Sequence, residues 1–141
     1  MPLRAFVGVA LGVIFGLLSA LHVFWAFGGT WGAGAAVAEI NGRPRFVPSK
    51  GATLVVAAAL ASAAVVVLTR AHLALGSVPS WASQWAAAVL GAVFVLRSIG
   101  DFRLMGFFKS VRGTLFAQRD TWLYSPLCLL LGLGAWWLAF A

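Results

Sequence analysis

Long apolar runs separated by short polar stretches dominate this sequence. The runs cover residues 5–28, 51–69, 81–99 and 121–141, and nearly all charged residues lie outside them or at their edges. Each run is close to the roughly 20 residues that an α-helix needs to cross the hydrocarbon core of a bilayer. Because an open strand edge in lipid would leave backbone groups unpaired, the pattern predicts helices. We therefore expect an all-α fold, an integral membrane bundle of four transmembrane helices, as a single domain over residues 1–141.

The composition supports lipid as the solvent of most of this chain. Hydrophobic residues make up 62% and charged residues 9%, whereas a soluble domain carries about 25% charged residues. The net charge of +7 is therefore interpreted as basic residues that flank the membrane, and we expect no nucleic-acid partner. A single cysteine excludes an internal disulfide, and His22 and His72 fall at opposite membrane faces. We expect no metal and no cofactor.

The order of the four spans fixes which loops share a face. The 28–50 and 100–120 loops lie on one side, which we call the loop face, and both termini lie on the other with the 70–80 loop. All three acidic residues belong to the loop face, and Arg4 and Arg70 are the only basic residues outside it. The positive-inside rule then predicts a cytoplasmic loop face and extracytoplasmic termini.

A stripe of small residues marks the first span. Gly8, Gly12 and Gly16 recur every four residues in GVALGVIFG, and such stripes let helix backbones approach closely in lipid. The stripe predicts helix packing, either inside the bundle or between two copies in a homodimer.

Ionisable side chains near the loop face supply the candidate site. His22 and Trp25 are three residues apart and share one side of the first helix. Arg97 and Asp101 are four apart at the end of the third helix, so we expect them to pair. A partner would reduce the insertion cost of an Arg, which is about 2.5–3.5 kcal/mol at a helix centre. The alternative is an interfacial Arg that reaches water, with Asp101 as its counter-ion.

The loop before the fourth span adds three further candidates. Asp120 precedes TWLYSPL and is a plausible N-cap of the fourth helix, and Tyr124 follows one turn later. Lys109 could bind a phosphate or a carboxylate, although basic residues beside anionic headgroups need no specific ligand. We expect these side chains to converge in a shallow ligand-binding site composed of His22, Trp25, Arg97, Asp101, Lys109, Asp120 and Tyr124.

At these residues the chain resembles a bacterial family of small four-helix membrane proteins, the domain of unknown function three-nine-nine-five. The matching stretches are HVFWAFGG at 22–29, RSIGDF at 97–102, GFFK at 106–109 and TLFAQRDTWLYSPLC at 114–128. The resemblance implies the four-helix fold and a shared loop-face site made of the seven residues just named. It brings no activity. For a bacterial chain of this kind we expect the inner (plasma) membrane.

These features favour a binding module that holds an anionic small molecule or a lipid headgroup. An enzymatic version would use His22 as a general base, oriented by Asp101 or Asp120. The alternative is an accessory or structural subunit of a larger membrane complex. A transporter is less favoured, because no span carries the central carboxylate expected of a small proton-coupled exporter. The expected partners are membrane lipids, an anionic ligand, and a homodimer or larger complex.

Overall fold

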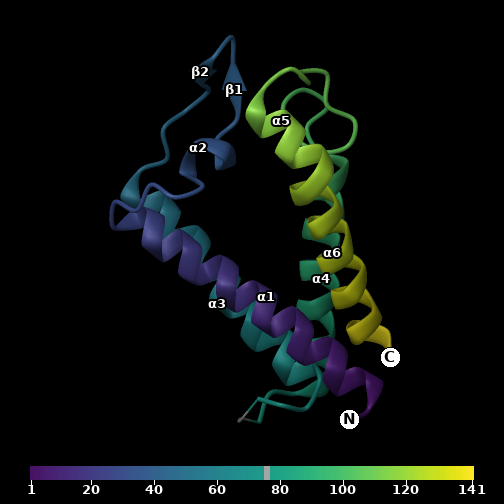
Figure 1. Ribbon diagram of the computed structural model, residues 1–141. Helices are drawn as coiled ribbons and strands as arrows, with labels where there is room; N and C mark the ends of the chain where they lie inside the picture. The colour runs from purple at the N-terminus through teal and green to yellow at the C-terminus, as the bar shows by residue number, and fades with distance from the viewer. Residues whose placement is uncertain (75–76) are drawn as a thin grey trace.

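Four long helices form two pairs that meet at one end and diverge toward the other (Figure 1). The computed structural model describes residues 1–74 and 77–141. In chain order the elements are α1 (Leu3–Ala26), α2 (Ala33–Ala36), β1 (Glu39–Ile40), β2 (Arg43–Pro44), α3 (Lys50–Arg70), α4 (Ser80–Ile99), α5 (Leu115–Arg119), the π-helix η1 (Asp120–Tyr124) and α6 (Ser125–Phe140). The last three are continuous, and we call Leu115–Phe140 the fourth span.

The prediction of an all-α protein with four spans is confirmed. The helices Leu3–Ala26, Lys50–Arg70, Ser80–Ile99 and Leu115–Phe140 are each long and apolar enough to cross a membrane. The extended structure in the described residues is one short hairpin, in which β1 pairs with β2.

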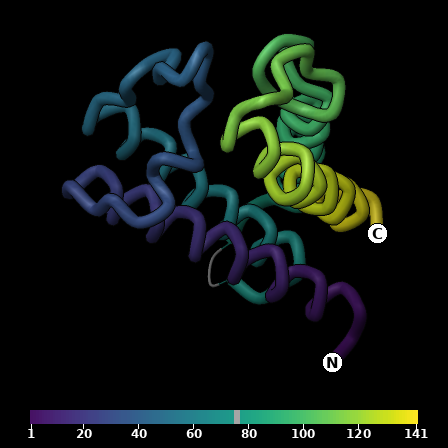
Figure 2. Tube along the Cα trace, turned by 45° about the horizontal axis from the view of Figure 1, so that its top comes forward, coloured from purple at the N-terminus to yellow at the C-terminus, as the bar shows by residue number. Residues whose placement is uncertain are grey.

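Each helix packs mainly on one partner. α1 lies along α3, and α4 lies along the fourth span, while contacts between the two pairs are fewer (Figures 1 and 2). The core where the pairs meet contains Phe15, Val67, Leu131 and Leu138, all nearly or fully buried. Phe15 also meets Phe94 of α4 edge to face, with ring centroids 5.2 Å apart. The core therefore lies between the converging ends, and the diverging ends leave room for a site.

The glycine stripe of α1 is used inside the bundle for two of its three members. A Cβ on Gly8 would meet the Ala71 side chain, and one on Gly12 would lie 3.0 Å from Leu68. Gly16 has no atom within 4 Å of such a Cβ. Gly8 and Gly12 thus allow α1 to approach α3 closely. Packing within the bundle accounts for them, and only Gly16 is left on an open surface.

A second pair of glycines, which the sequence did not single out, joins α4 to the fourth span. A Cβ on Gly91 would lie 2.8 Å from the Gly132 carbonyl oxygen, and one on Gly132 would lie 2.9 Å from the Gly91 carbonyl oxygen. Because each glycine faces the backbone of the other helix, the two backbones touch here.

The fourth span begins earlier than the predicted residue 121. It starts at Leu115, and the Thr114 hydroxyl accepts a hydrogen bond from the Ala117 amide at 3.1 Å. The prediction that Asp120 caps this helix is therefore wrong: Asp120 lies inside the helix, at the start of η1. The π-helix ends at Tyr124, two residues before Pro126, which has no N–H for a helical hydrogen bond. Single π-turns of this kind are frequent at functional sites.

The segment between α1 and α3 crosses the open end of the molecule. It contains α2 and the hairpin, in which Ile40 lies opposite Arg43. The Tyr124 hydroxyl donates to the Ala35 carbonyl at 2.9 Å, so the fourth span holds α2 across the gap between the two pairs (Figure 1).

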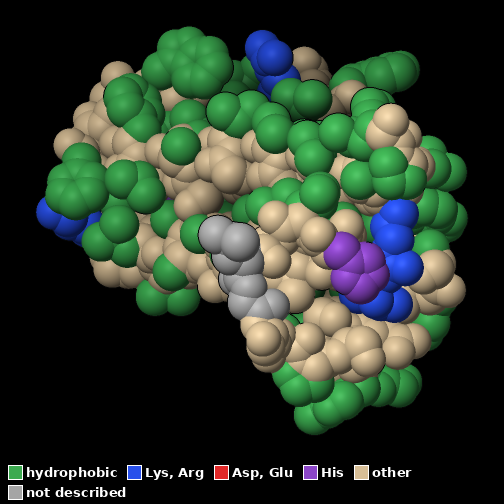
Figure 3. Space-filling model, turned by 90° about the horizontal axis from the view of Figure 1, so that it is seen from below, with side chains coloured by type: hydrophobic (Ala, Val, Ile, Leu, Met, Phe, Trp, Pro, Cys, Tyr) green, Lys and Arg blue, Asp and Glu red, His purple; other side chains and the backbone are tan. Residues whose placement is uncertain are grey.

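Two arginines join the helix ends at the opposite face. Arg4 donates through Nε to the Arg70 carbonyl at 3.0 Å and through Nη1 to the Ala141 carbonyl at 2.8 Å. Arg70 donates to the Ala139 carbonyl at 2.9 Å. Figure 3 shows this end with basic side chains beside a histidine and no acidic side chain among the described residues in view. These bonds satisfy helix-terminal carbonyls and hold α1, α3 and α6 together where the pairs converge.

Candidate functional site

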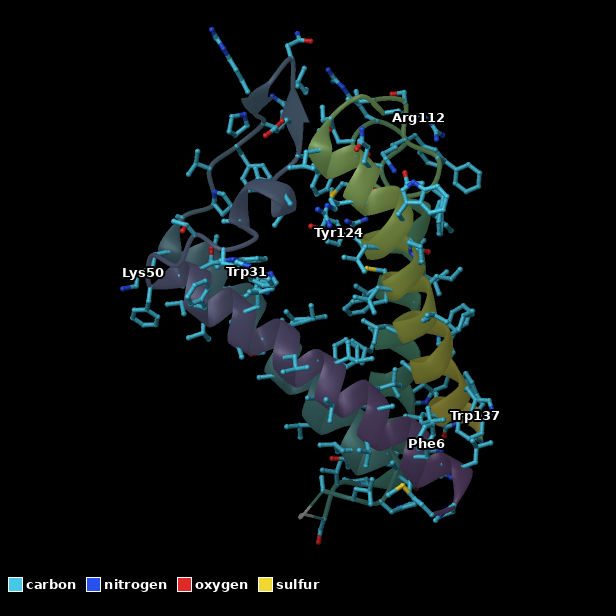
Figure 4. The ribbon with its side chains drawn as sticks, in the orientation of Figure 1. Phe6, Trp31, Lys50, Arg112, Tyr124 and Trp137 are labelled. Carbon is cyan, nitrogen blue, oxygen red and sulfur yellow. The ribbon has the colours of Figure 1, made fainter. Side chains whose placement is uncertain are left out.

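A cavity of about 620 Å³ lies between the two helix pairs, beneath α2. Its volume falls within the roughly 300–1,000 Å³ that is usual for ligand sites. Every long helix contributes to its wall, and Figure 4 shows Tyr124 and Trp31 on opposite sides of this space. The lining residues are Leu18, Leu21, His22, Trp25, Trp31, Gly32, Ala35, Ala36, Val56, Leu60, Phe94, Arg97, Phe116, Arg119, Leu123, Tyr124, Leu127, Cys128 and Leu131.

Four of the seven predicted site residues line this cavity: His22, Trp25, Arg97 and Tyr124. They come from α1, α4 and the fourth span, so segments distant in sequence meet at one place. The structure thus brings these four together as expected, while their role in binding stays a prediction.

The aromatic side of the cavity is held by hydrogen bonds to the backbone. His22 Nδ1 lies 2.7 Å from the Leu18 carbonyl oxygen. Because a carbonyl oxygen only accepts, this contact assigns the hydrogen to Nδ1 and leaves Nε2 as an acceptor. The His22 ring packs edge to face on Trp25, with centroids 5.0 Å apart. Trp25 in turn donates to the Trp31 carbonyl at 2.8 Å, which fixes the start of the connection to α2.

No carboxylate orients His22 among the described residues. Its Nδ1 is engaged by Leu18, and both oxygens of Asp120 are engaged by other donors. The prediction that Asp101 or Asp120 would position His22 as a general base is therefore wrong for this arrangement.

Asp120 lies at the centre of a buried ionic cluster behind the cavity wall. Its Oδ1 accepts from Arg97 at 2.8 Å, and its Oδ2 accepts from Lys109 at 3.1 Å and from the Gly106 amide at 2.7 Å. The Asp120 and Lys109 side chains are fully buried, whereas the Arg97 side chain is 29% exposed. The cluster joins the end of α4, the 100–114 loop and the fourth span.

Lys109 is fully satisfied within this cluster. Its Nζ also donates to the Gly106 carbonyl at 2.9 Å and to the Thr121 hydroxyl at 2.6 Å. An ammonium has three donors, and all three are used. Lys109 was predicted to contact a ligand, but in this structure it turns inward and does not line the cavity.

The ionic cluster has more positive than negative charge, and the excess lies on Arg97. One carboxylate serves two cations, so the group holds one excess positive charge. Nη2 of Arg97 binds Asp120, whereas Nη1 is buried with no hydrogen-bond partner among the described residues. Arg119 adds a second cation to the cavity wall, and no acidic side chain among residues 1–74 and 77–141 lines it. The end of the cavity nearest the loop face is therefore suited to an anion.

Asp101 does not take part in this site, and the expected Arg97–Asp101 pair is wrong. α4 ends at Ile99, and Gly100 adopts a φ of +92° that turns the chain away from the helix axis. Asp101 Oδ1 instead accepts from the amides of Arg103, Leu104 and Met105, at 3.0, 2.7 and 3.0 Å. Its carboxylate closes an exposed loop, and Arg97 pairs with Asp120, which is 23 residues further along the chain.

This loop is expected to loosen in acid. The Met105 amide is the largest cause that holds the pKa of Asp101 below its ordinary value of 3.8. A lowered pKa means that the carboxylate stabilises the loop above pH 3.8 and that this contribution is lost as the pH falls through the lowered pKa. Hydrogen exchange of the Arg103–Met105 amides should accelerate in that window relative to the amides of α4. Asp101→Asn should remove the pH dependence, and a dependence that survives it would contradict this assignment.

Two polar residues of the cavity wall, Arg119 and Cys128, are not among the residues predicted from the sequence. Cys128 follows Tyr124 by four residues and therefore shares its helical face, so that spacing could have revealed it. A fourth span that starts at residue 121 places Arg119 in the loop before it, so the predicted start of that span hides its position on the cavity wall. Within the described residues no group of three His, Cys, Asp or Glu side chains could hold a metal ion.

The four apolar helices are those of a multi-pass membrane protein, with a mostly apolar cavity between its two helix pairs. The family model described as "Protein of unknown function (DUF3995)" matches residues 15–135, and the chain belongs to this family. That match includes every residue that lines the cavity. No curated protein and no solved structure matches the chain.

Proposed function

We propose that this protein is a membrane-embedded binding module that holds an anionic group, from a small molecule or a lipid headgroup, at the end of the cavity nearest the loop face. Arg97 and Arg119 supply positive charge and hydrogen-bond donors, and Trp25 forms an aromatic wall. The Tyr124 hydroxyl and His22 Nδ1 already donate to backbone carbonyls, so the Tyr124 oxygen and His22 Nε2 can accept a hydrogen bond from a hydroxyl or a protonated oxygen of the ligand. The observation that carries the proposal is the buried Nη1 of Arg97, which has no partner among the described residues and belongs to a side chain that lines the cavity.

Charge balance supports this proposal. Arg97, Lys109 and Asp120 sum to one positive charge, and a partly buried charge without a counterpart is unfavourable in a low-dielectric setting. An anion beside Arg97 would neutralise the group and give Nη1 a charge-assisted hydrogen bond, which is stronger than one between neutral groups. Lys109 cannot take this role, because its three donors are already engaged.

Replacing Arg97 separates a binding role from a structural one. In Arg97→Gln, Lys109 and Asp120 still form a one-to-one pair, so the variant should fold with little loss of stability. The wild type in phosphatidylcholine nanodiscs should be stabilised by inorganic phosphate or octyl phosphate, by about 1.4 kcal/mol at ten times the dissociation constant. Thermal unfolding with and without each probe measures this, and the gain should vanish in Arg97→Gln.

Arg103→Gln is the matched control, because Arg103 is an exposed arginine on the same face and does not line the cavity. It should keep the full stabilisation by phosphate. The proposal is overturned if neither probe stabilises the wild type, or if Arg97→Gln responds as strongly as Arg103→Gln does.

The accessory-subunit alternative has less support. The glycine stripe that would dock on a larger complex faces α3 at Gly8 and Gly12. A stable heteromeric partner, found by mass spectrometry after purification in a mild detergent, would favour this alternative over the binding module.

A further inference from the structure

The cavity changes from polar to apolar along three of its helices, and in the same direction on each. On each of these helices a polar lining residue nearer the loop face has an apolar lining residue about one turn deeper, although Phe116 and Leu123 add apolar surface near the loop face and Cys128 lies deeper. The successive pairs, polar residue first, are His22 and Leu18 on α1, Arg97 and Phe94 on α4, and Tyr124 and Leu127 on the fourth span. Leu131 lies seven residues beyond Tyr124, which at 1.5 Å per residue is a depth of about 10 Å.

This change in polarity along the cavity wall also indicates what kind of molecule the cavity can hold. A small hydrophilic anion at Arg97 would leave the deeper half of the cavity, lined by Leu18, Leu60, Phe94, Leu127 and Leu131, facing no apolar group. Apolar walls favour an apolar filling, and ligand sites are commonly mostly apolar with a few polar groups that fix orientation.

We propose that the occupant is an anionic amphiphile with a single hydrocarbon chain. This inference rests on the proposed function, since it places the anionic head at Arg97 and Arg119. The chain runs between the two helix pairs against Leu18, Phe94 and Leu127. The volume of about 620 Å³ fits a ligand of drug-like size, which a single-chain amphiphile matches and a two-chain phospholipid exceeds.

Photolabelling tests where the chain lies. The protein in phosphatidylcholine nanodiscs is exposed to a long-chain fatty acid that carries a diazirine near the middle of its chain, and the labelled residues are mapped by mass spectrometry. Saturable labelling is expected at Phe94 and Leu127, with non-saturable background at the exposed Leu130 and Leu133. The matching fatty alcohol has the same chain but no charge, and it should label only the background positions.

Two variants separate the head from the chain. Arg97→Gln should reduce cavity labelling about tenfold or more, the usual effect of losing a charge-assisted hydrogen bond, and should leave the background unchanged. Leu18→Phe narrows the apolar part and should reduce labelling at Phe94 and Leu127. Leu17→Phe is its matched control, because Leu17 is 67% exposed and does not line the cavity.

The outcomes distinguish this inference from the proposed function. Phosphate stabilisation that depends on Arg97, together with cavity labelling no stronger than the background, would overturn the amphiphile and leave the anion site standing. Equal cavity labelling by the alcohol, unaffected by Arg97→Gln, would overturn both. Saturable labelling by the acid alone, lost in Arg97→Gln and in Leu18→Phe, supports both.

Discussion

Asp120→Asn is expected to lower the free energy of unfolding by about 3–5 kcal/mol, the usual cost of removing one partner from a buried ion pair. The reason is that Lys109 is fully buried and would then hold a charge with no opposite charge beside it. Arg97 would also lose the one charged partner that it has in the described part of the chain. The loss should appear as a lower midpoint in thermal or denaturant unfolding of the purified protein.

Two further variants make this result specific. Glu39→Gln makes the same kind of change at a half-buried acid on the same face, and it should leave the unfolding midpoint nearly unchanged. The double variant Asp120→Asn, Lys109→Met should recover part of the lost stability, because it removes the buried charge that Asp120→Asn leaves behind. If Asp120→Asn proves as stable as Glu39→Gln, the buried cluster does not hold the loop-face end together.

Gly132→Ala is expected to destabilise the protein by about 1–3 kcal/mol, the range typical of overpacking. The new Cβ would lie 2.9 Å from both the Gly91 carbonyl oxygen and the Val95 amide nitrogen. Both are backbone atoms, so relief requires α4 and the fourth span to move apart. Unfolding midpoints in the same bilayer mimetic measure the effect, and Gly91→Ala should behave alike.

Gly16→Ala is the control for this contact. It is also a mid-helix glycine, but no atom lies within 4 Å of the added Cβ. Alanine favours helix over glycine by up to about 1 kcal/mol, so this variant should be neutral or stabilising. A Gly132→Ala protein as stable as Gly16→Ala would show that the two backbones are not in contact.

The sequence predicted the spans well, because their length and hydropathy follow from the bilayer alone. It misplaced the start of the fourth span, because the charged residues Arg119 and Asp120 look like a loop when their partners are unknown. Asp120 can lie inside a helix because Arg97 and Lys109 neutralise it there. That compensation depends on tertiary contacts and leaves no local signal.

The candidate site is likewise predicted only in part, because some of its contacts depend on tertiary structure. His22, Trp25 and Tyr124 were recognised because helical spacing and depth identify residues that share a face. The i,i+4 spacing predicts Asp101 as the partner of Arg97, but this spacing brings two side chains together only while the helix continues. Gly100 ends the helix between them with a positive φ, and glycine allows such a turn without requiring it.

The two helix pairs are fastened differently, and this difference bears on how the molecule can move. α4 and the fourth span are clamped at the loop face by the Asp120 cluster and deeper by the Gly91–Gly132 contact, so they form a unit that resists splaying. The α1–α3 pair touches that unit chiefly near the converging ends. At the loop face the two are linked by the hydrogen bond from Tyr124 to the Ala35 carbonyl. If the gap between the two pairs widens, we therefore expect one pair to swing against the other, with the converging end as the pivot.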